Sequence, residues 1–114
     1  MTHRISLGAI LLLTICSFGA LDAQQNTSTL GIDELFTLAR KEAFAGKRGE
    51  ARILLRRILL QSPNYVDVRV LLGRTLAWDG KYDSARIELH RALKSDPSNA
   101  DAYRALIDTE NWSE

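Results

Sequence analysis

The sequence predicts an all-α fold of stacked helical hairpins, and three observations support this prediction. The chain repeats itself with a period of 34 residues, leucines recur at helical spacing within each period, and glycine and proline fall between the helical stretches. Residues 32–65 and 66–99 share 13 identities in 34 positions. Such a period is typical of a helical array in which each hairpin buries its apolar face against the next.

Five helices are expected, at residues 32–45, 48–61, 65–79, 82–95 and 100–112. Gly46 and Gly80 should end the first helix of each hairpin, because glycine adopts the left-handed backbone of a helix cap at low cost. Pro63 and Pro97 should end the second helix, since proline cannot continue one.

Side-chain size supports the same arrangement. Gly73 and Ala85 are small, so the two helices of the second hairpin can approach closely. Ser98 with Asp101 is the predicted capping pair of the last helix. Recurring leucines form the predicted apolar seam of this hairpin, at Leu72, Leu76, Leu89 and Leu93.

The repeat resembles the tetratricopeptide repeat (TPR) family, and residues 66–99 match it best. The positions that carry the resemblance are Leu72, Gly73, Gly80, Tyr82, Ala85, Leu89, Ala92 and Pro97. Arg69 and Leu76 depart from the family's aromatic positions, and the first copy has Ala39 and Arg48 where the family has Gly and Tyr. The resemblance implies a short right-handed solenoid of about two and a half repeats, at residues 32–65, 66–99 and 100–114.

Residues 1–23 have the pattern of a secretory signal peptide, and residues 24–31 that of a polar linker. Arg4 precedes an apolar run over residues 5–15, and smaller or polar residues lead to Ala23. An uncleaved anchor is an alternative, although this run is shorter than the roughly 20 residues of a membrane-spanning helix. Lipidation of Cys16 is another, which the large Ile15 before it disfavours. We expect export to the periplasm or outer membrane of a Gram-negative bacterium, or secretion.

Composition and motifs argue against several classes of function. The net charge of +1, from 15 basic and 14 acidic residues, does not indicate nucleic-acid binding. Cys16 is the single cysteine, so no disulfide framework is expected. The sequence has no phosphate-binding glycine loop, no HExxH and no Ser/His/Asp set, and His90 is expected at the surface. We therefore expect no catalytic activity, metal or cofactor.

The resemblance implies a concave groove, lined by the first helix of each repeat, that binds a protein or peptide partner. The groove residues that it implies are Asp33, Phe36, Arg40, Asp67, Val70, Arg74, Trp78, Arg104 and Asp108, with Phe44, Ala77, Asp101 and Trp112 at further groove positions.

Two alternatives stay open for the charged groove residues. Arg40 and Arg74 can bind a carboxylate of a ligand, since guanidinium groups grip carboxylates with two hydrogen bonds, or they can pair with Asp33 and Asp67 across the groove. The aspartates that recur every 34 residues can form a ligand row, or can favour the positive ends of three helices.

The recurring aromatic and basic residues have simpler explanations. Phe44, Trp78 and Trp112 are better explained by packing between repeats than by a ligand platform. The basic residues of the second helices are expected on a solvated outer face: Arg52, Arg56, Arg57, Arg86, Arg91 and Lys94.

Two functions are compatible with these features. The first is an exported adaptor that presents the groove to a partner. The second is an N-terminal assembly segment of a larger outer-membrane protein, because residues 70–82 and 111–113 resemble the repeats that precede the barrel in the YaiO-type family. The missing catalytic constellation disfavours a small enzyme.

Overall fold

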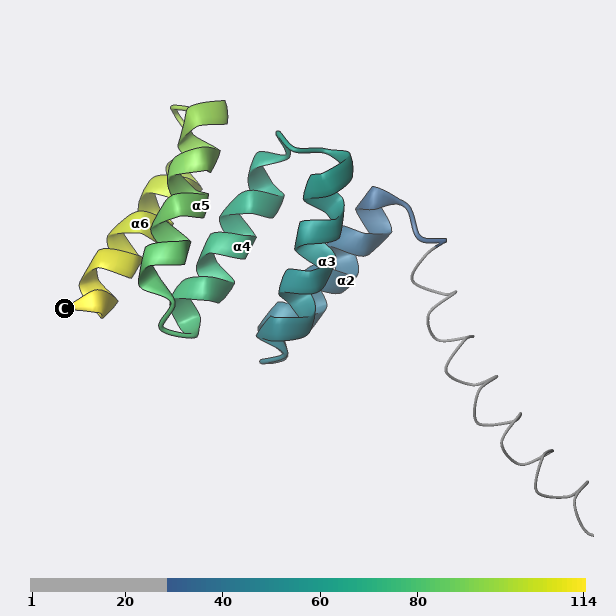
Figure 1. Cartoon of the computed structure of the whole chain (residues 1–114), viewed down its shortest axis with the longest axis horizontal. Helices are drawn as coiled ribbons and strands as arrows, with labels where there is room; N and C mark the ends of the chain where they lie inside the picture. The colour runs from purple at the N-terminus through teal and green to yellow at the C-terminus, as the bar shows by residue number, and fades with distance from the viewer. Residues whose placement is uncertain (1–28) are drawn as a thin grey trace, which may run out of the picture. The chain divides into compact units, whose positions relative to one another are not determined.

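The computed structural model describes residues 29–114, which form five helices (Figure 1). They are α2 (Ile32–Phe44), α3 (Arg48–Gln61), α4 (Val66–Trp78), α5 (Tyr82–Ser95) and α6 (Ala100–Ser113). All lie in the compact unit Ile32–Glu114, and no strand occurs in the described part of the chain. The all-α prediction is confirmed, and the expected helices agree with these bounds to within one residue at each end. The predicted signal peptide, with Cys16, lies outside the described residues.

The helices form two hairpins and a further helix. α2 packs on α3 and α4 on α5, while α3 contacts α4 and α5 contacts α6, so each element is buried against the next (Figure 1). In addition, α4 contacts both α2 and α6. The first helix of each repeat therefore lies beside the first helix of the next. No helix within residues 29–114 combines the length and apolar character needed to cross a bilayer.

Glycine closes the first helix of both hairpins as predicted. Gly46 has φ +85° and Gly80 has φ +73°. The amide of the next residue donates back across the turn, from Lys47 to the Glu42 carbonyl and from Lys81 to the Leu76 carbonyl, both at 2.9 Å. This is the hydrogen-bond pattern that ends a helix with a left-handed residue.

Close packing of α4 on α5 depends on Gly73. A Cβ atom added there would lie 2.6 Å from Leu89 Cγ, well inside ordinary contact distance. Leu72, Leu76 and Leu89 are buried in the predicted seam, and Leu93 is partly buried beside them. The lack of a side chain at position 73 thus lets Leu89 lie against the backbone of α4.

The cap of α6 differs from the prediction. Asn99, not Ser98, is the N-cap, and its Oδ1 accepts the Ala102 amide at 2.9 Å. Ser98 instead donates its amide and hydroxyl to Asp96 Oδ1, at 3.3 and 3.1 Å. These bonds and one from Asn99 Nδ2 lower the pKa of Asp96, with the Asn99 bond the largest cause. The predicted pair was wrong because Asp96 engages Ser98 within the turn.

The solvated outer face was wrongly predicted for Arg52. Its residue is 7% exposed, and its Nη1 donates to the Thr75 carbonyl at 3.0 Å and lies 2.7 Å from Asp79 Oδ2. Arg48 Nε binds the other oxygen of Asp79 at 2.6 Å. The reason is tertiary: the end of α4 brings Asp79 against α3, and Arg52 turns toward it.

The other basic residues of the second helices remain nearer the solvent. Arg56 and Lys94 are exposed, as is His90. Arg91 pairs with Glu88 at 2.9 Å, and Arg86 pairs with Glu110 of α6. The bond from Arg86 is the main cause that lowers the pKa of Glu110.

Candidate functional site

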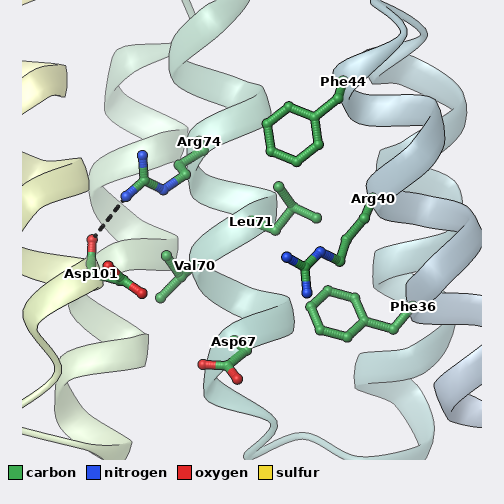
Figure 2. A pocket seen from close by; sticks show the side chains of 8 residues that line it. All are labelled: Phe36, Arg40, Phe44, Asp67, Val70, Leu71, Arg74 and Asp101. Atoms are coloured by element: carbon green, nitrogen blue, oxygen red, sulfur yellow. Dashed lines mark hydrogen bonds between the residues drawn. The ribbon is translucent and has the colours of Figure 1, made fainter.

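A pocket of about 310 Å³ opens where α2, α4 and α6 lie side by side (Figure 2). Its lining residues come from these three helices and are Phe36, Arg40, Phe44, Asp67, Val70, Leu71, Arg74 and Asp101. The contacts of α4 with α2 and α6 fix this arrangement, because they align equivalent faces of three successive first helices.

The floor of the pocket is apolar. Val70 and Leu71 are both buried and belong to α4, while Phe36 and Phe44 project from α2 at the rim (Figure 2). Phe44 is 71% exposed, although its ring contacts Trp78 with 5.8 Å between centroids. Phe36 is fixed on its other side by an edge-on contact with Tyr65. The pocket thus offers apolar contact area that water reaches from one side.

Arg40 lies over the ring of Phe36, with 5.5 Å from its Cζ atom to the ring centroid (Figure 2). Such a cation–π contact orients the guanidinium without neutralising it. Within residues 29–114 Arg40 forms no ion pair with a carboxylate. Its positive charge therefore remains available at the mouth of the pocket.

Arg74 lies on the opposite side of the floor. Its Nη2 donates to the backbone carbonyl of Asp101 on α6, at the long distance of 3.4 Å (Figure 2). In the described part of the chain it too has no ion pair. A guanidinium has five N–H donors, so most of the hydrogen-bonding capacity of Arg74 is unused.

Three aspartates recur with the repeat, and each lies in the first turn of its helix: Asp33 in α2, Asp67 in α4 and Asp101 in α6. A negative charge there favours the positive end of the helix dipole. The predicted alternative of pairing with the arginines is not formed, since neither Asp33 nor Asp67 bonds Arg40 or Arg74. Asp67 and Asp101 still place negative charge at one end of the pocket.

The pocket gathers five of the nine residues predicted for the groove: Phe36, Arg40, Asp67, Val70 and Arg74. The other four lie elsewhere. Asp33 is exposed near the start of α2, and Trp78 packs against Phe44. Arg104 is exposed and pairs with Asp101 at 3.4 Å, and Asp108 is partly buried farther along α6.

The further groove positions also divide. Phe44 and Asp101 line the pocket, whereas Ala77 is buried and Trp112 is 47% exposed near the end of α6. Leu71 was missed, because it falls outside the groove positions that the resemblance implied. The signal for it was the run 70–72 of three apolar residues, which is too wide for a helix with a single buried face.

No group of three or more His, Cys, Asp or Glu side chains suited to a metal ion occurs among residues 29–114. Every fully buried polar side-chain atom of this region has a hydrogen-bond partner. The chemistry that the pocket offers is therefore recognition by two arginines, two aspartates and an apolar floor.

A family model of the tetratricopeptide repeat matches residues 45–108, from the turn after α2 to the middle of α6. No curated protein matches the chain. Repeats of this family serve generally as scaffolds for protein–protein interaction and are typically not catalytic. With its period of 34 residues, its glycine-closed hairpins and a match over more than half of its length, the chain belongs to the tetratricopeptide repeat family.

Proposed function

We propose that this chain is an exported scaffold that binds an acidic segment of a protein or peptide in the pocket between α2, α4 and α6. One observation carries the proposal: Arg40 and Arg74 flank an apolar floor, and neither is ion-paired within residues 29–114. Arginines whose charge is not matched inside the protein are suited to pairing with a charge on a partner.

The pocket chemistry favours one kind of ligand group. A carboxylate placed between the two arginines would be held by charge-assisted hydrogen bonds, which the apolar floor strengthens by excluding water. An adjacent aliphatic or aromatic side chain would contact Val70 and Leu71. Asp67 and Asp101 at the same pocket disfavour a polyanion, so we expect a single carboxylate beside an apolar residue.

The experiment is selection of a random peptide library on the immobilised protein, followed by fluorescence polarisation of selected peptides. We expect enrichment of peptides that carry Asp, Glu or a free C-terminus beside an apolar residue. The double variant Arg40→Gln/Arg74→Gln should weaken their binding about tenfold or more.

A matched control separates the pocket from overall charge. Arg56→Gln/Lys94→Gln removes the same two charges from exposed positions on α3 and α5, and should change the affinity less than about twofold. Equal losses in both double variants, or selected peptides without a carboxylate preference, would refute the proposal.

The exported location rests on the signal-like pattern of residues 1–23, which lie outside the described residues. Fractionation of cells expressing the full chain should recover it outside the cytoplasm with a mass that begins near Gln24. The resemblance of residues 70–82 to the YaiO-type family supports a second role, as an assembly segment of a larger outer-membrane protein. The gene sequence downstream of the Glu114 codon distinguishes the two roles.

A further inference from the structure

One face of α6 exposes large apolar side chains outside the pocket. Ile107 is 60% exposed and Tyr103, one turn earlier, is 49% exposed. At 100° per residue, Ile107 lies about a third of a turn around the helix from Asp101, which lines the pocket. This face is therefore distinct from the proposed binding pocket.

Comparison with the equivalent helices shows that this face is unusual. The 34-residue period aligns Ile107 with Ala39 and Gly73, and both of these are buried. At Gly73 even a Cβ atom would lie 2.6 Å from Leu89 Cγ of α5. An isoleucine at the same position would hold a second helix much farther away.

The next position along this face leads to the same conclusion. Asn111 aligns with Ala43 and Ala77, which are buried at 3% exposure each, whereas Asn111 is exposed. In the two complete hairpins the small residues allow a close approach of the helices. The α6 face is thus not shaped to take the second helix of a third hairpin, and it still exposes apolar area.

Tyr103 is held in place on this face. Its hydroxyl donates to the Pro97 carbonyl at 3.0 Å, in the same way that Arg69, its equivalent in α4, donates to the Pro63 carbonyl at 2.7 Å. A tyrosine with a fixed hydroxyl and an exposed ring loses little conformational entropy on binding, which suits it to an interface.

We propose that this face binds the same face of a second copy of the chain, with the two α6 helices antiparallel about a two-fold axis. Ile107 lies at the middle of α6, so such an axis brings it against its own counterpart, as an isologous interface requires. Residues before Ile107 then face residues after it on the other copy. Tyr103 lies near Glu110 of the second copy and Arg104 near Asn111 of the second copy, so no like charges are opposed.

Sedimentation equilibrium of the protein purified from expression of the full chain tests this. We expect a monomer–dimer equilibrium that Ile107→Lys weakens by about tenfold or more. Ile53→Lys is the matched control, because Ile53 is 63% exposed on α3 and should leave the dissociation constant unchanged. Far-UV circular dichroism should show equal helix content in both variants. A wild-type chain that stays monomeric to about 1 mM, as expected if a different protein covers this face, would overturn the proposal.

A cross-linking experiment tests the two-fold axis directly. In a Cys16→Ser background, Ile107→Cys should form a disulfide-linked dimer under mild oxidation, since the two residues meet at the axis. Leu60→Cys, which is 85% exposed on α3, is the control and should cross-link at least about tenfold more slowly. Equal rates at the two positions, or a dimer unaffected by Ile107→Lys, would contradict the pairing. Neither outcome bears on peptide binding, which depends on Arg40 and Arg74.

Discussion

Arg52 Nη1 lies 2.7 Å from Asp79 Oδ2, and this ion pair joins the first hairpin to the second. Arg52 comes from α3 and Asp79 from the residue that caps α4. The Arg52 side chain retains 9% of its exposure and that of Asp79 25%, so solvent screens the pair only in part. A repeat array is stabilised through such contacts between neighbours.

Asp79→Asn should lower the free energy of unfolding by about 1–3 kcal/mol, because it leaves the charge of the buried Arg52 without a counterion. Urea denaturation followed by circular dichroism measures this. Asp83→Asn is the control: Asp83 also pairs with an arginine, but its side chain is 99% exposed, so we expect a change within about 0.5 kcal/mol. Equal effects of the two substitutions would mean that the Asp79 pair contributes no more than a surface pair.

The same pair should make the stability depend on acid. Hydrogen bonds from Arg48 first, and then from Arg52, hold the pKa of Asp79 below its ordinary value. A carboxyl whose pKa is lowered by folding stabilises the fold above the unfolded-state pKa, about 3.9, and loses this contribution as the pH falls through the folded pKa. We therefore expect the gap in stability between wild type and Asp79→Asn to be full at pH 7 and to shrink below about pH 4. Urea midpoints for both proteins at pH 7, 5 and 3 measure it, and a gap that does not change with pH would contradict this origin.

Gly73→Ala should destabilise the protein even though alanine favours helices. The new Cβ atom would lie 2.6 Å from Leu89 Cγ, and we expect a net loss of about 1–3 kcal/mol from overpacking. Gly49→Ala, in the first turn of α3, has nothing within 4 Å of the new atom and should be neutral or stabilising by up to about 1 kcal/mol. Thermal melts of the two variants separate the effects. If Gly73→Ala melted at or above the wild-type temperature, the close approach of α4 and α5 would not be limiting.

Features that depend on one residue type could be predicted from the sequence. Gly46 and Gly80 adopt positive φ because this backbone is accessible mainly to glycine, so their period also located both hairpin turns. The leucine seam followed from helical spacing in the same way. Five of the predicted groove residues line one pocket because the repeat places equivalent positions of α2 and α4 side by side.

Features that depend on the distance between repeats could not be predicted. Arg52 occupies the same repeat position as Arg86, yet it turns inward to Asp79, whereas Arg86 binds Glu110. Leu71 was assigned to no binding surface, although it forms the pocket floor. Both outcomes depend on which side chain the neighbouring hairpin brings close, and the spacing within one helix does not contain that information.

Asn99→Ala tests the cap that the sequence misassigned. It removes the acceptor of the Ala102 amide, 2.9 Å away, and the donor that binds Asp96 Oδ2 at 3.2 Å. Loss of an N-cap side chain costs about 1 kcal/mol, so we expect that decrease in the free energy of unfolding. Ser98→Ala removes a hydroxyl that bonds Asp96 in an exposed turn, and should cost less than about 0.5 kcal/mol. Urea denaturation of the two variants decides between the assignments: a larger loss at Ser98 would restore it as the residue on which the start of α6 depends.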